Sequence, residues 1–132
     1  MPLLQFLLGF RALNTPSFTV ADDSVFGDEF NKERVASRCY RYLDSDVYFL
    51  VARRGRALMV HVCALSREAR RLLRKAGYAL LFEMPQLYNW CRMIIALVKS
   101  MSIYNLCCKI GFKDLGFVRY GASKAKLMTV KL

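Results

Sequence analysis

The feature that most constrains the fold is an apolar run that leads directly into a basic amphipathic helix. The run covers residues 57–64 and predicts a buried strand, because it is short, apolar and rich in β-forming residues. The helix predicted over residues 66–77 begins at Ser66, a good N-cap, and stops at Gly77, which suits the left-handed conformation that ends many helices. A strand that feeds a helix in this way favours an α/β or α+β layer structure.

The predicted helix carries its apolar residues on one face. Positions 69, 72, 73 and 76 follow the i, i+3, i+4, i+7 spacing, so this face should pack against the sheet. Cations occupy much of the rest of the helix. Of these, Arg71, Arg74 and Lys75 are predicted to contact phosphates or an acidic partner. A solvated surface without a specific partner is the alternative interpretation.

The charge of the chain favours anionic partners. It contains 21 Lys and Arg against 10 Asp and Glu, which gives a formal net charge of +11. Nucleic acid, a coenzyme that carries phosphates and an acidic protein surface are all compatible with such a charge. A length of 132 residues suits a single domain over 1–132, with a helical or loop part at 1–37 and a sheet-containing part at 38–132.

Two hairpins are predicted around glycine-containing turns. Residues 47–51 and 56–62 are rich in β-branched and aromatic side chains and flank the turn at Gly55. Residues 112–120 and 124–132 flank a second turn at 121–123 and predict a final hairpin.

Helical signals are more scattered. Residues 3–13 and 28–37 are predicted to form short helices, and Ser100 or Ser102 is predicted to start a helix that continues to Lys109 and ends at Gly111. Met84-Pro85 is predicted to break the chain. The periodicity of residues 87–98 is compatible with either a strand or a helix.

Cysteine and histidine give little sign of a reactive centre. The five cysteines are odd in number and form no CxxC pair, which favours reduced thiols in a reducing compartment. His61 is the sole histidine and has no further ligand at metal-binding spacing, so no metal site is expected. We interpret His61 as a residue of the core or sheet surface. The apolar run at residues 1–10 is too short to span a bilayer, and no membrane span is expected.

The order of the predicted elements from residue 47 to 132, with a helix that closes on Lys109-Ile110-Gly111-Phe112, resembles the C-terminal half of the GNAT (N-acetyltransferase) superfamily. The resemblance implies an α+β fold with a mixed, mainly antiparallel sheet flanked by helices in a single domain. It also implies an acyl-CoA channel beside the closing helix. In this family a tyrosine on that helix can protonate the leaving thiolate, and Tyr104 is the matching residue if the chain is an acyltransferase.

One departure from the family concerns the phosphates of the coenzyme. Members carry a glycine-rich turn, Q/R-x-x-G-x-G/A, whose exposed amides hold the pyrophosphate at a helix start. Residues 64–71 occupy this place without a glycine, so Arg67, Arg70 and Arg71 would have to bind the phosphates. We therefore expect a degenerate site without a cofactor, and a protein that acts by binding and not by catalysis. Acetyl-CoA is the expected cofactor if the chain is an acyltransferase.

A narrower resemblance depends on Leu65-Ser66, the arginine-rich helix, residues 84–90 and Ile110-Gly111-Phe112. These look like the small GNAT-like internal virion proteins of podovirus-type bacteriophages. The resemblance implies a virion-associated or assembly protein in the virion or host cytoplasm, with other virion or assembly proteins as partners and DNA as a further partner of the basic helix. The alternatives are an acetyl-CoA-dependent N-acyltransferase with an arginine-rich phosphate site and a basic nucleic-acid-binding module.

Overall fold

Seven strands form one sheet in the part of the chain that the computed structural model describes, residues 13–27 and 37–132. The strand order is β1-β2-β3-β4-β5-β7-β6, and every neighbouring pair is antiparallel except β4 and β5. The α+β fold with a mainly antiparallel mixed sheet, predicted from the sequence, is confirmed. The strands are β1 (Phe18–Ala21), β2 (Ser37–Tyr42), β3 (Val47–Arg54), β4 (Ala57–Ala64), β5 (Met93–Val98), β6 (Lys113–Tyr120) and β7 (Ser123–Lys131).

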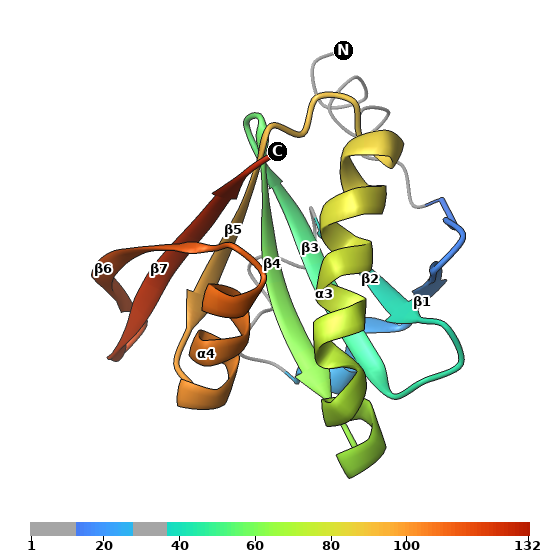
Figure 1. Cartoon of the computed structure of the whole chain (residues 1–132), viewed down its shortest axis with the longest axis horizontal. Coiled ribbons are helices and arrows are strands. Elements are labelled where there is room, and N and C mark those ends of the chain that lie inside the picture. Colours follow the sequence, from blue (N-terminus) through green and yellow to red (C-terminus); the bar gives the residue numbers. More distant parts are fainter. Residues whose placement is uncertain (1–12, 28–36) are drawn as a thin grey trace.

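Two α-helices cover the same face of the sheet (Figure 1): α3 (Arg67–Leu87) and α4 (Met101–Lys109). Helix α3 packs on a core from strands β2 to β5, where Tyr40, Leu58 and Ile94 are fully buried. Helix α4 packs on a smaller core that includes Met128 of β7. Phe112 contacts both cores. The helix-covered face therefore holds two apolar cores that meet at Phe112.

The opposite face of the sheet is covered in part by the 3₁₀-helix η1 (Asp23–Phe26). Phe26 packs there with Cys39 and Leu50, which alternate with the residues that face α3. Because side chains alternate along a strand, His61 and Cys63 of β4 also point to this second face. Strand β1 was not predicted from the sequence.

Helix α3 is longer than predicted. It continues through Gly77, which has no positive φ, and includes Pro85, so the predicted stop at Gly77 and the predicted break at Met84-Pro85 are both wrong. A Cβ on Gly77 would lie 2.9 Å from Cδ1 of Ile110, so the glycine permits close packing against the end of α4. Leu80 and Met84 are buried and hold the extra turns on the core. Pro85 lies in the last turn, where its missing N–H removes only one internal hydrogen bond.

The predicted hairpins and the predicted ends of the second helix are confirmed. The hairpin around Gly55 is the β3–β4 pair, and Gly55 has a φ of 64°. Ser100 caps α4, Gly111 follows the helix with a φ of 104°, and the final hairpin is the β6–β7 pair. In the ambiguous stretch 87–98, residues 93–98 form a strand. The helices predicted at 3–13 and 28–37 lie almost entirely outside the described residues. None of the described helices is long and apolar enough to cross a membrane.

Glu83 ties α3 to the segment before β1. Its side chain is only 8% exposed, and its Oε1 accepts a hydrogen bond of 2.8 Å from the Ser17 amide. Burial by itself raises the pKa of Glu83, but hydrogen bonds from the side chains of Ser17 and Thr15 and from the Ser17 amide outweigh it, so the pKa is lowered from its usual 4.5. The folded state therefore favours the carboxylate form.

We expect Glu83→Gln to lower the free energy of unfolding by about 1 kcal/mol at pH 7, because an amide oxygen accepts these bonds more weakly than a carboxylate. Since the pKa of Glu83 is lower in the folded state, its contribution is complete above pH 4.5 and is lost as the pH falls through the folded-state pKa. Urea unfolding at pH 7 and pH 3 measures the effect. The gap between wild type and variant should narrow at pH 3, and a gap independent of pH would contradict the assignment.

Candidate active site

The candidate site begins where the only parallel strand pair of the described sheet ends. Strands β4 and β5 pair at four positions, from Ala57 with Met93 to Val60 with Ala96. Beyond Val60, β4 continues beside β3 as far as Ala64, whereas β5 continues beside β7. Figure 1 shows the two strands diverging toward the N-terminal end of α3. The facing edges of β4 and β5 therefore carry no ladder hydrogen bonds to one another in this region.

A cavity of about 350 Å³ lies at this divergence. From the helix-covered face it is lined by apolar residues of β4, β5, α3 and α4, including Val62, Leu73, Val98 and Ile103. From the opposite face it is lined by Val25, Phe26, His61, Cys63, Leu97 and Tyr120. Because both faces contribute to its wall, the cavity extends through the gap between the two strands. Its volume is in the range of small-molecule sites.

The polar side chains of the cavity gather on the face that η1 covers. The His61 and Tyr120 rings lie 6.2 Å apart between centroids, at an angle of 32°. Lys99, at the end of β5, places its Nζ 4.9 Å from the centre of the Tyr120 ring. His61 is buried, as the sequence predicted, but it also lines the cavity. Sequence reasoning missed this, because Tyr120 belongs to a distant strand and no local pattern joins the two residues.

Two cysteines also line the cavity, and neither is suited to nucleophilic attack. Burial raises the pKa of Cys63, and burial together with the neighbouring Cys108 raises the pKa of Cys107 to about 11. Both side chains are therefore protonated thiols at neutral pH. All five cysteines are free, and Cys108 is the one that is exposed.

Tyr104 lies on α4, as predicted, but it is not among the residues that line the cavity. Its hydroxyl donates a 2.9 Å hydrogen bond to Oδ2 of Asp114 on β6. The same oxygen accepts from Nζ of Lys126 at 3.0 Å. The bond to Asp114 is the main reason that the pKa of Tyr104 is raised to about 12. The general-acid role of Tyr104 stays a prediction, and its hydroxyl is already bonded outside the cavity.

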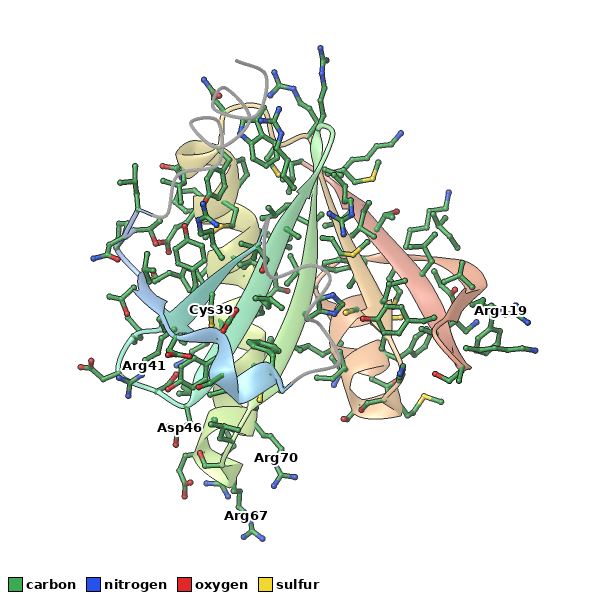
Figure 2. All side chains as sticks on the ribbon, turned by 180° about the vertical axis from the view of Figure 1, so that it is seen from behind. Cys39, Arg41, Asp46, Arg67, Arg70 and Arg119 are labelled. Atoms are coloured by element: carbon green, nitrogen blue, oxygen red, sulfur yellow. The ribbon has the colours of Figure 1, made fainter. Side chains whose placement is uncertain are left out.

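The predicted phosphate-binding residues lie at the start of α3. Arg67, Arg70 and Arg71 are all exposed, and Figure 2 shows Arg67 and Arg70 extending from the same end of the helix. The Ser66 hydroxyl accepts a 3.0 Å hydrogen bond from the Ala69 amide, so one free amide of the first turn is already satisfied. The structure thus places cationic side chains, and no glycine, at the start of α3.

The predicted partner-binding residues Arg71, Arg74 and Lys75 are all exposed on α3. Their partner is untested, and the assignment stays a prediction. Within residues 13–27 and 37–132, no group of three or more His, Cys, Asp or Glu side chains could hold a metal ion.

Solved structures of acetyltransferases share the fold of this chain. Aminoglycoside acetyltransferase AAC(6')-Ib, crystallised with coenzyme A, superposes with a TM-score of 0.62 over 77% of this chain and 69% of its own, at 13% identity. A Bacillus subtilis acetyltransferase in complex with CoA gives 0.60 over 88% and 98%, at 11% identity. A GNAT-family acetyltransferase from Streptococcus pneumoniae gives 0.55 over 77% and 71%, at 17% identity.

The chain has the GNAT fold. The identities are low, so the likeness concerns the fold and not the activity. No protein-family model and no curated protein matches the sequence. Within the GNAT fold of this chain, the divergence of β4 and β5 and the cavity between them are the features that could accommodate a ligand.

The hydrogen bond between Tyr104 and Asp114 can be tested by titration. We expect the pKa of Tyr104, about 12 in the native protein, to fall toward the usual 10.0 in Asp114→Asn, because the carboxylate that disfavours the tyrosinate is removed. NMR of ring-labelled tyrosine at increasing pH, with Tyr104→Phe to assign the resonance, measures the shift. An unchanged pKa in Asp114→Asn would contradict the contact.

Proposed function

We propose that this protein is a coenzyme A-dependent acyltransferase that acts on an amine. The observation that carries the proposal is the cavity that opens where β4 and β5 stop pairing and that reaches both faces of the sheet. The structures with the same fold support it, because they are acetyltransferases and two of those described above were crystallised with coenzyme A. A cavity with walls from both faces of the sheet has room for two substrates that meet between the strands.

The walls of the cavity fit the pantetheine arm of the coenzyme. The arm is narrow and contains two amide groups, which can pair with strand edges that lack a partner. Such edges face one another at residues 62–64 of β4 and 97–98 of β5, beyond the last paired positions of the two strands. The apolar side chains on the helix-covered face, among them Leu73, Val98 and Ile103, would pack along the arm.

The start of α3 has the positive charge that the phosphates of the coenzyme require, but it lacks glycines that would expose backbone amides to them. Arg67, Arg70 and Arg71 would supply guanidinium groups to the diphosphate, with Glu68 as the one acidic residue of the first turn. Leu65 and Ser66 hold side chains where glycine would let phosphate approach the backbone. We therefore assign phosphate binding to arginine side chains.

His61 is the side chain best placed to move a proton. The bound coenzyme would supply an acyl group activated as a thioester. Imidazole is a common general base because it can accept and release a proton near neutral pH. In the proposed reaction His61 accepts the proton that the amine loses, and the tilted ring of Tyr120 lies beside the imidazole, 6.2 Å away between centroids.

The earlier expectation of a protein without a cofactor finds no support in the structures with this fold. The resemblance to phage virion proteins stays a prediction, and the structures reported above are named acetyltransferases. Binding of nucleic acid through α3 also stays a prediction. An acyltransferase is the function that the cavity favours over these two, because a binding module needs no passage through its sheet.

A thermal-shift titration with acetyl-CoA tests the proposal. At a concentration one hundred times the dissociation constant, a ligand that binds only the folded state adds about 2.7 kcal/mol to its stability, so the melting temperature should rise by several degrees. ATP at the same concentration serves as a control for non-specific anion binding. If millimolar acetyl-CoA shifts the melting temperature no more than ATP does, the proposed function is wrong.

The assignment of the phosphates has its own test. We expect Arg67→Ala/Arg70→Ala to weaken coenzyme A binding by about tenfold or more, because two charge-assisted contacts are lost. The same variant should bind pantetheine, which has no diphosphate, as the wild type does. Arg74→Ala/Lys75→Ala removes two cations further along α3 and is the matched control. Calorimetry measures the affinities of the wild type and of both double variants for coenzyme A and for pantetheine. Equal losses of coenzyme A affinity in both double variants would show that the effect is one of net charge.

A further inference from the structure

The part of the cavity on the η1 face is the space left for the acceptor amine, and its wall has a definite chemical character. Phe26, Leu97 and the Tyr120 ring supply apolar surface, and His61 supplies the polar group. We infer that the acceptor is an amine with an apolar, ring-bearing body and a single basic nitrogen, and not a polycation. This inference rests on the proposed acyltransferase function and names its substrate class.

Charge is the first argument. None of the described residues that line the cavity is an aspartate or glutamate, and the one cation among them is Lys99 at the end of β5. Among these described wall residues, an additional ammonium group of a polycation would find no carboxylate and would lie near Lys99. Removing such a charge from water is costly unless it is paired.

The nearest acidic residues of η1 do not reach the cavity. Asp22 caps the 3₁₀-helix by accepting a 2.7 Å hydrogen bond from the Ser24 amide. Burial, and after it the charges of Asp23 and Asp22, raise the pKa of the Cys39 thiol on β2 to about 12. Cys39 is not part of the cavity wall. Neither Asp22 nor Asp23 is among the described residues of the cavity wall.

Apolar burial is the second argument. An aromatic ring gains free energy when it leaves water for a pocket with Phe26, Leu97 and Tyr120 in its wall. A monoamine can then present its nitrogen to His61 as the free base, with no other charge to bury. The amine nitrogen bonds to the acyl carbon, the carbon–sulfur bond of the thioester breaks, the amine proton passes to His61 and on to water, and the departing thiolate takes up a proton as a thiol.

Two probe amines separate the classes. 2-Phenylethylamine represents the apolar monoamines and spermidine the polycations. With acetyl-CoA as donor, we expect kcat/KM for 2-phenylethylamine to exceed that for spermidine by about tenfold or more. Ligand-observed NMR without donor should show the same order of affinity. Tighter binding or faster turnover of spermidine, or no binding of 2-phenylethylamine, would overturn the inference.

Charge reversal gives a matched pair of variants. Lys99→Glu places a carboxylate in the cavity wall, and Lys109→Glu makes the same change on an exposed part of α4 outside it. We expect Lys99→Glu to improve the affinity for spermidine by about fivefold or more and Lys109→Glu to change it by less than about twofold. Equal effects of the two variants would mean that spermidine binds elsewhere. They would overturn the assignment of the acceptor amine to the part of the cavity on the η1 face.

The role of His61 has a test of its own. His61→Gln should lower kcat/KM for 2-phenylethylamine by about 100-fold while the acetyl-CoA thermal shift stays unchanged. If acetyl-CoA fails to stabilise the wild type, the acyltransferase proposal fails. If acetyl-CoA binds and spermidine is the better acceptor, the acyltransferase proposal stands and only the inference about the acceptor fails.

Discussion

The short parallel pairing between β4 and β5 is the constraint on which the rest of this structure depends. Only four residue pairs join the two strands, and each strand is then drawn to a different antiparallel partner, β4 to β3 and β5 to β7. The sheet therefore consists of two halves, each with its own helix and its own apolar core. Gly77 and Phe112 keep the halves together, the first by close contact between α3 and Ile110 and the second by packing on both cores.

The same divergence explains the chemistry of the site. The cavity is apolar because it lies between two hydrophobic cores, and burial keeps the thiols of Cys63 and Cys107 protonated. His61 and Tyr120 are brought to one face of it by strands that belong to different halves. In the proposed reaction, a histidine in a largely apolar wall would suit a neutral nucleophile, since apolar surroundings penalise additional charge.

The fold determines the gap between β4 and β5 more strongly than it determines the start of α3. The gap between β4 and β5 is a consequence of sheet topology, and the chain has this fold although its sequence is very different from those of the solved acetyltransferases reported above. The start of α3 depends on local sequence, where Leu65 and Ser66 replace the small residues that would expose backbone amides. Arg67 and Arg70 extend from the start of α3 and would give the proposed phosphate site its positive charge.

The sequence by itself determined the local elements, namely the turn at Gly55, the cap at Ser100 and the stop at Gly111, because each depends on residues adjacent in the chain. It also predicted the α+β fold through the order of these elements. It misjudged Gly77, since a glycine that ends a helix and one that permits close packing look alike until the packed neighbour is known. Only the tertiary structure placed His61 beside Tyr120 and Tyr104 beside Asp114, because a side chain's partner across a sheet is set by strand order and register, which no local pattern encodes.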